Sequence, residues 1–343
     1  ENGNHTVKQP LSYDFYHLSG AALFALLLNL KHLYLPLAPL YFCYLLERYC
    51  LSIRIPAGKK RKQFLPGKFL LLASVTGIAL VVPWIPFIMC PDPTSQLVQI
   101  LKRLFPFGRG LVHDYWAGNI WAIYTFSNRV LTFIIGHLGP KLKLVLPEEI
   151  GSTLDNMYLP EPTPLVCAVL LFLTIIPALQ VASSRLTNKK FIEAVVYVSF
   201  CSFMLAYHVH EKAILTALIP LALLVEPTPR GEYYNLLFWQ MNIWGLLGLF
   251  PLLYRSIELS IKVSSFLCYL GMTSCILRTP PPWIQDMQYI TIGLVVFVTL
   301  LLEVAPIQGK WESLPLMVTS IACSFGLVRC FGMSFWLLLR VNK

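Results

Sequence analysis

Four ionisable side chains stand together in an otherwise apolar part of the sequence. The stretch AYHVHEKAIL, residues 206–215, places His208, His210, Glu211 and Lys212 between two strongly apolar runs. Charged groups at membrane depth are costly, so they usually face a cavity or a partner and mark a functional site. If the segment is helical, His208, Glu211 and Lys212 share one face and His210 points away. This set suits an anionic or hydroxyl-rich ligand, or a structural charge pair at a helix end.

A metal site is not expected in this stretch. Its spacing differs from HExxH, in which two histidines and a glutamate surround zinc. The nine cysteines of the chain form no CxxC pair, and most lie within or beside apolar runs. We therefore expect neither a metal nor another cofactor.

Another polar group, Lys31 and His32, interrupts the apolar run LNLKHLYLPLAPLYF. Pro36 and Pro39 follow closely, and proline interrupts helices, so the pattern predicts a helix that ends or kinks near Lys31. Both side chains would then lie at an interface as ligand-binding candidates. The alternative is a lysine that reaches the membrane surface from the end of a short span.

A further polar group lies in RLFPFGRGLVHDYWAGNIWAIY, residues 103–124. Here Arg109, His113 and Asp114 alternate with aromatic residues, a composition typical of a segment that lies along a membrane interface. Aromatic rings beside polar groups also suit a sugar, whose faces stack on rings while its hydroxyls form hydrogen bonds. An interfacial helix without chemistry is the alternative.

The composition indicates a membrane protein. Hydrophobic residues make up 56% of the 343 and charged residues 13%, which is too apolar for a soluble globule of this length. The net charge of +10 reflects basic residues in loops rather than a nucleic-acid partner. The densest basic segment, Arg48 to Lys68, is expected to be cytosolic by the positive-inside rule.

Apolar runs of spanning length predict an all-α, polytopic protein with about nine or ten membrane segments in a single domain, residues 1–343. The runs are Leu18 to Leu46, Phe69 to Cys90, Trp116 to Leu138, Pro162 to Ala182, Phe191 to Tyr207, Ala213 to Val225, Tyr233 to Tyr254, Ile257 to Leu277, Met287 to Ile307 and Ser313 to Leu339. The sequence opens at Glu1 like a loop between spans, so we expect a fragment. It carries a glycosylation sequon at Asn4.

Three motifs, in their order along the chain and at these distances, closely resemble the dolichyl-phosphate-glucose-dependent α-1,3-glucosyltransferases that assemble the N-glycan precursor in the endoplasmic reticulum. In chain order the first motif is LNLKHLYLPLAPLYF, the second is RLFPFGRGLVHDYWAGNIWA and the third is YHVHEKAIL. The resemblance runs over essentially the whole chain. It is greatest to the member that adds the second glucose, through HVHEKAIL and the histidine-containing loop. The member that adds the first glucose usually has an acidic pair where this sequence has His113 and Asp114, and it stays an alternative.

The resemblance implies a GT-C fold in the membrane of the endoplasmic reticulum, with the site open to the lumen. It implies that a hydroxyl of the dolichyl-pyrophosphate-linked oligosaccharide attacks dolichyl-phosphate-glucose with inversion. Because a phosphate leaves readily, one carboxylate base is enough. The family places this base, an aspartate, in its first luminal loop, which we expect to be missing from this chain. The catalytic residue is therefore left unassigned, and neither Asp114 nor Glu211 is taken as the base.

The residues that match the family's motifs are donor- or acceptor-binding candidates: Lys31, His32, Arg109, His113, Asp114, His210, Glu211 and Lys212, with His208 added from the pattern. Cations suit phosphate or pyrophosphate. The expected partners are the two dolichol-linked substrates and the lipid bilayer. If Trp116 to Leu138 lies along the luminal face, strict alternation places HVHEK in the lumen. A secondary transporter is the rival class, although such proteins show internal repeats and none is evident here.

Overall fold

The computed structural model describes residues 11–54, 61–105, 108, 110–111, 117–142, 159–184, 187–226, 228, 231–253, 258–276, 286–287, 289–291, 293–294, 297 and 314–340. Most of these residues are helical, as the sequence predicts. The longer helices are α1 (Leu11–Leu30), α3 (Pro66–Val81), α5 (Pro93–Leu104), α6 (Ile120–Leu142), α7 (Pro164–Ala182), α8 (Asn188–Leu205), α10 (Glu232–Leu249), α11 (Leu259–Ile276) and α13 (Leu314–Leu339). Shorter helices are α2 (Ala38–Leu45), α4 (Ile85–Ile88) and α9 (Leu215–Ala222).

The basic segment departs from the all-α expectation. It contains two antiparallel strands, β1 (Leu51–Arg54) and β2 (Arg61–Phe64), with Leu51 opposite Phe64. The two strands pair their backbone N–H and C=O groups with each other, so this segment needs no helix with a buried face. The fold is therefore mostly helical with one two-stranded sheet among the described residues.

Three helices are long and apolar enough to cross a membrane, counted over the part of the chain that the structure describes. They are Pro66–Ile88, Pro164–Ala182 and Leu316–Leu339, and Ile120–Ile135 is a shorter apolar helix. Their exposed surfaces carry large apolar side chains, such as Ile78 and Phe172. Membrane helices are confirmed in this way, while the total of nine or ten segments stays a prediction.

The chain divides into two compact units, and each is described by itself. The first contains residues 1–106 and 178–191, and the second contains residues 107–177 and 192–343. The single multi-span domain of residues 1–343 stays a prediction.

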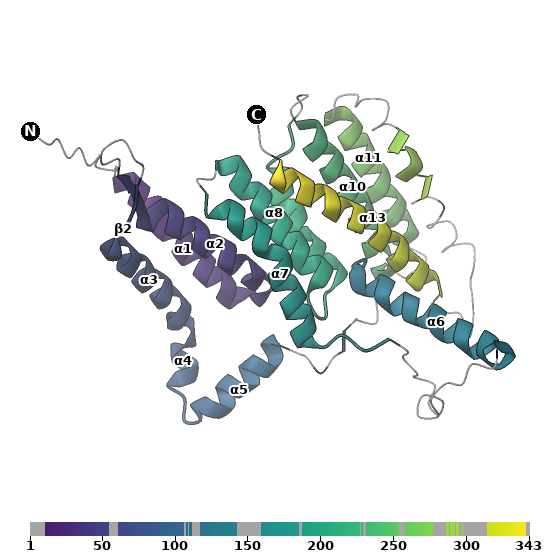
Figure 1. Ribbon diagram of the computed structural model, residues 1–343, viewed down its shortest axis with the longest axis horizontal. Coiled ribbons are helices and arrows are strands. Elements are labelled where there is room, and N and C mark those ends of the chain that lie inside the picture. The colour runs from purple at the N-terminus through teal and green to yellow at the C-terminus, as the bar shows by residue number, and fades with distance from the viewer. Residues whose placement is uncertain are drawn as a thin grey trace, which may run out of the picture. The chain divides into compact units, whose positions relative to one another are not determined.

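In the first unit, α1 and α3 run in the same direction side by side (Figure 1). Near their starts, the Lys68 ammonium lies 2.8 Å from the Asp14 carboxylate. Near their ends, the Asn29 amide lies 3.2 Å from the Leu80 carbonyl oxygen. Because α1 and α3 run in the same direction, the chain between them must run back in the opposite direction.

The helix α2 supplies this return. Rings of α1 contact rings of α2 in reverse order: Phe24 stacks on Tyr41 at 4.6 Å, and His17 lies 6.4 Å from Tyr44. The long apolar run Leu18 to Leu46 is therefore two segments that fold back on each other rather than one span. Buried Ala21, Leu45, Tyr49, Cys50 and Leu72 form the core between these elements.

The side chain of Asn29 replaces a backbone hydrogen bond that Pro83 removes at the end of α3. Proline has no N–H, so it leaves the carbonyl of Ala79, four residues earlier, without its helical partner. The Asn29 side chain donates to that carbonyl at 3.2 Å, and its own oxygen accepts from Trp84 Nε1 at 2.6 Å. Neighbouring helices commonly satisfy proline breaks in membranes in this way.

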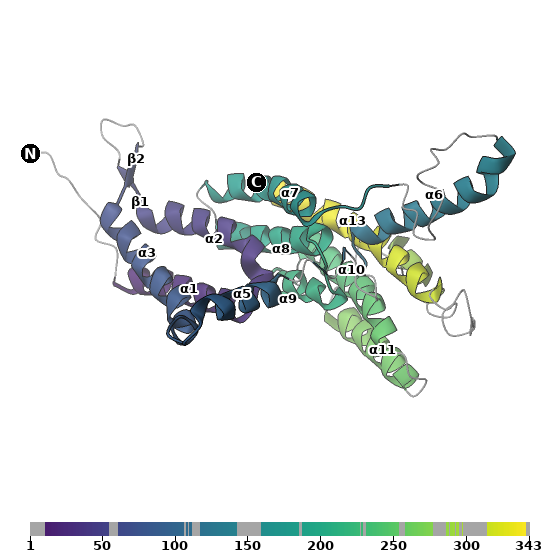
Figure 2. The same cartoon turned by 90° about the horizontal axis from the view of Figure 1, so that it is seen from below.

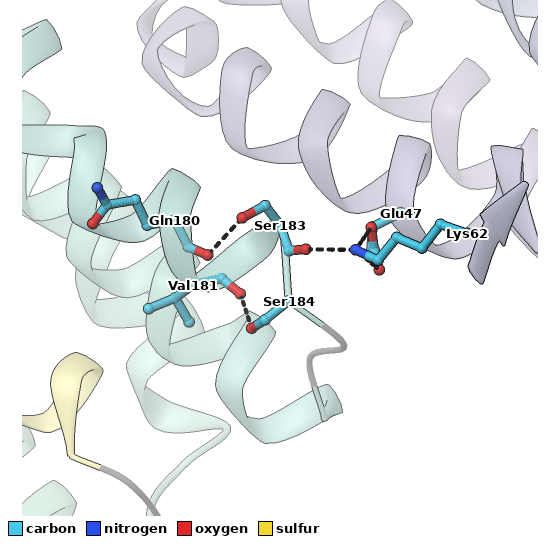
Figure 3. Close-up of polar contacts among 6 residues, drawn as sticks. All are labelled: Glu47, Lys62, Gln180, Val181, Ser183 and Ser184. Atoms are coloured by element: carbon cyan, nitrogen blue, oxygen red, sulfur yellow. Dashed lines mark hydrogen bonds and ion pairs between the residues drawn. The ribbon is translucent and has the colours of Figure 1, made fainter. Parts of the chain in front are cut away.

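The opposite end of the first unit is held by the hairpin. Lys62 Nζ lies 2.8 Å from both carboxylate oxygens of Glu47 and donates to the carbonyl of Ser183, which follows α7, at 3.3 Å (Figure 3). The last carbonyls of a helix lack intrahelical partners and attract cations. Lys62 therefore connects β2 both to the π-helix Leu46–Cys50 that follows α2 and to the end of α7.

In the second unit, α10 and α13 pack side by side, as the views in Figures 1 and 2 agree. Tyr197 of α8 stacks on Phe331 of α13 at 5.5 Å. A Cβ added at Gly326 would lie 2.2 Å from the ring of Trp244, so only glycine allows α13 to approach α10 this closely. Gly118 has the same role beside Cys323, where an added Cβ would lie at 2.6 Å. The segment before α6 therefore packs directly on α13.

Candidate functional site

The stretch with four ionisable groups is not helical throughout. The helix α8 ends at Leu205, His208 has a φ of 54°, and a 3-10 helix begins at Glu211 and ends at Ile214. His210 has extended backbone angles between these elements. The shared helical face of His208, Glu211 and Lys212 depended on a continuous helix, and the left-handed turn at His208 removes that premise.

This turn brings the third motif onto the second. The backbone N–H of His208 donates to the carbonyl of Leu111 at 3.1 Å, and its Nδ1 lies 2.9 Å from the carbonyl oxygen of Gly110. A carbonyl oxygen only accepts, so Nδ1 carries the proton in this contact. Gly110 has a φ of 81°, a conformation that glycine adopts without strain.

Two further side chains of the same loop hold the end of α8. Asn119 Nδ2 donates to the carbonyl of Phe203 at 3.3 Å, and Trp121 Nε1 donates to that of Ala206 at 3.2 Å. The last carbonyls of a helix need such partners. Trp121 is one of the aromatic residues expected at the membrane interface, whereas Asn119 was not among the candidates, although both stand in the quoted motif. Their signal is a polar group and an indole N–H within a run that is otherwise apolar.

His210, Glu211 and Lys212 occupy different environments. The rings of His208 and His210 meet edge to face, with centroids 5.6 Å apart. Glu211 is 6% exposed, while Lys212 is exposed. A buried carboxylate next to an exposed ammonium leaves the ammonium available for an anionic ligand.

Lys31 and His32 lie in the first unit, where the helix break is confirmed. α1 ends at Leu30, Lys31 has extended backbone angles, and a 3-10 helix covers His32–Leu37. Both side chains are exposed. The His32 ring lies 5.5 Å from that of Phe105, so the first motif contacts the start of the aromatic loop.

The remaining candidates, Arg109, His113 and Asp114, lie outside the described residues. Their neighbours Gly110 and Leu111 are described, and both contact His208. No group of three or more His, Cys, Asp or Glu side chains suited to a metal ion occurs among the residues with described positions. The described candidates carry hydrogen-bonding and cationic groups, the kinds of group that suit phosphates and hydroxyls.

Comparison with known proteins supports the resemblance carried by these motifs. Dolichyl pyrophosphate Glc1Man9GlcNAc2 alpha-1,3-glucosyltransferase of Mus musculus is 33% identical over 336 residues, which cover 91% of this chain and 61% of the relative. The protein of the same name from Chaetomium globosum is 36% identical over 322 residues, or 89% of this chain and 65% of the relative. That from Bos taurus is 31% identical over 346 residues, or 95% and 62%.

The chain thus spans less than two thirds of the length of these relatives. The match to a family is nonetheless nearly complete along the chain itself, because it extends over residues 11–334 and includes all three motifs. On this basis the chain belongs to the ALG6, ALG8 glycosyltransferase family.

Proposed function

We propose that this protein adds a glucose to the Glc1Man9GlcNAc2 oligosaccharide on dolichyl pyrophosphate and forms an α-1,3 linkage. The observation that carries the proposal is that relatives with this activity in their name match about nine tenths of the chain, 91% for the mouse protein. The proposed donor is dolichyl-phosphate-glucose, and the reaction inverts the anomeric configuration. The enzyme is then a hexosyltransferase.

The proposed location is the membrane of the endoplasmic reticulum, with a multi-pass GT-C fold. Three long apolar helices support a polytopic membrane protein. In the first unit, α1 and α3 both start beside the basic hairpin, which the positive-inside rule assigns to the cytosol. Lys31 and His32, at the far end of α1, then lie on the luminal side, where the sugar is transferred.

The polar groups receive roles by their chemistry. Lys31, His32, Arg109 and Lys212 suit the phosphate of the donor or the pyrophosphate of the acceptor, because cations and phosphates form strong charge-assisted hydrogen bonds. The exposure of Lys31 and Lys212 supports this role.

The other candidates suit the sugar. Asp114 and Glu211 would accept hydrogen bonds from hydroxyls, with His113 and His210 beside them as donors or acceptors. Because the resemblance assigns the base to an aspartate of the family's first luminal loop, no residue of this chain is assigned as the base. These residues would bind and orient the substrates.

The test uses microsomes from cells that lack the second glucosyltransferase, complemented with the full-length protein that contains this chain. Lipid-linked oligosaccharides are measured by mass. We expect the monoglucosylated species to gain one glucose with the unaltered protein and to lose this gain with His210→Ala plus Glu211→Gln. Glu232→Gln on α10 is the control, because it removes a carboxylate outside the site.

The acceptor separates the alternatives. A gain on the species without glucose would instead assign the first addition. No gain on either species with the unaltered protein would refute the glucosyltransferase proposal, and dependence of sugar movement on an ion gradient would favour a transporter.

A further inference from the structure

We propose that His208 is a positioning residue for glucosyl transfer rather than a ligand of the substrates. It holds the backbone of Gly110 and Leu111 against the turn that leads to His210. This inference rests on the proposed function and deepens it, because it separates the residue that fixes the site from those that contact sugar or phosphate.

The first argument is the two-point attachment. His208 contacts two consecutive carbonyls, that of Leu111 through its N–H at 3.1 Å and that of Gly110 through Nδ1 at 2.9 Å. Two adjacent contacts from one residue fix both the position and the direction of a peptide segment. Nδ1 is used by the Gly110 carbonyl, and the other ring nitrogen, Nε2, is buried away from the surface that a substrate could reach.

The second argument is the backbone of His208. Its φ of 54° lies in the left-handed region, which is unfavourable for residues with a side chain. Such a conformation persists only where the surroundings hold it, and it concentrates at functional sites. The contacts to Gly110 and Leu111 are the surroundings that hold it here, and the turn directs the chain toward His210.

The third argument is that the fold does not need this contact to attach the loop. Asn119 and Trp121 already bind the carbonyls of Phe203 and Ala206 at the end of α8. The close packing of Gly118 on Cys323 adds a further anchor. The His208 contact is thus an additional constraint placed at the point where the second and third motifs meet, as expected for orientation of a site.

The experiment is a double-mutant cycle between His208→Ala and Gly110→Ala in the full-length protein. A Cβ at Gly110 meets no heavy atom within 4 Å, so Gly110→Ala acts only by disfavouring the left-handed backbone that presents its carbonyl. Gly108→Ala is the matched control, because a Cβ there also meets open space and its φ is not in the left-handed region. His208→Asn is the conservative variant, since Asn carries a donor at the same distance from the backbone and tolerates left-handed angles.

The quantities measured are kcat and KM per folded molecule, with thermal unfolding of each variant. We expect each single alanine variant to lower kcat/KM by up to about tenfold, the worth of one hydrogen bond. The double variant should lose little more than either single one, because both remove the same constraint. His208→Asn should retain most of the activity, and Gly108→Ala should match the unaltered protein.

Three results would overturn the proposal: effects of His208→Ala and Gly110→Ala that multiply, a loss that follows only the folded fraction, or no recovery with His208→Asn. Failure of the proposed function is a separate result, because the unaltered protein would then add no glucose at all.

Discussion

Replacement of Lys62 by methionine should destabilise the first unit more than replacement of its partner Glu47 by glutamine. The two groups form an ion pair with both carboxylate oxygens 2.8 Å from Nζ. The Glu47 side chain is 7% exposed and that of Lys62 is 51% exposed. Removal of the lysine therefore leaves a buried carboxylate, while removal of the carboxylate leaves an ammonium that still reaches water.

The two exposures set the magnitude. Loss of one partner from a fully buried pair costs about 3–5 kcal/mol, and an exposed pair contributes about 0–1 kcal/mol. This pair is intermediate, so we expect Lys62→Met to lower the free energy of unfolding by about 2 kcal/mol. Glu47→Gln should lower it by less than about 1 kcal/mol. The combination Lys62→Met with Glu47→Leu should recover most of the loss, because no charge remains buried.

Two measurements test this: thermal unfolding of the purified full-length protein in detergent, and the rate at which a protease cleaves the hairpin. The control is Lys102→Met on α5, which removes an exposed lysine outside this contact. Lys62→Met should also speed cleavage at the hairpin, since Lys62 ties β2 to the Ser183 carbonyl. Equal losses for the two single variants, or a double variant whose loss equals their sum, would refute the reasoning.

Four shorter predictions follow. Asn29→Leu should lower the free energy of unfolding by about 1 kcal/mol, because a carbonyl of α3 and an indole N–H, both part-buried, lose the partner that Asn29 provides, and chemical denaturation measures this. Gly326→Ala should lower the melting temperature by overpacking the contact of α13 with α10, while Gly332→Ala, which meets open space, should not. Burial raises the pKa of the Cys50 thiol, with Lys68 opposing the shift, so its alkylation by a maleimide should be slow at pH 7 and faster at higher pH. Asn4 should stay unglycosylated, shown by unchanged gel mobility after endoglycosidase treatment, because the start of α1 lies beside the start of α3, which follows the hairpin that the positive-inside rule assigns to the cytosol.

The helix break at Lys31 was predictable because its cause is local. Pro36 and Pro39 restrict the backbone of their neighbours whatever the tertiary context, and α1 ends at Leu30 as expected. The return of α2 along α1 was not predictable from the same residues. A run of apolar side chains is equally compatible with one long span and with two that fold back, and only ring contacts such as Phe24 with Tyr41 distinguish them.

The hairpin was missed for a related reason. Residues 51–55, LSIRI, alternate apolar and polar side chains over only five positions, and the basic run of residues 59–62 shows no such alternation, so the pattern of period two is too short to stand out. Their strand conformation depends on pairing between β1 and β2, which is a contact between distant residues. The cytosolic side of this segment stays a prediction, and it does not depend on the strands, because the positive-inside rule depends on charge and not on secondary structure.

The third motif shows why candidate residues were easier to find than their roles. Ionisable groups in an apolar run are visible in composition alone, so His208 and His210 are selected together. Their roles differ because one residue adopts a left-handed turn and binds the Gly110 carbonyl, while the next histidine follows in extended conformation. No periodicity encodes that turn, since it is held by a loop almost a hundred residues earlier, at a sequence separation of 98. A histidine in a motif is therefore evidence for a site, and only its partners decide whether it binds substrate or holds the site in place.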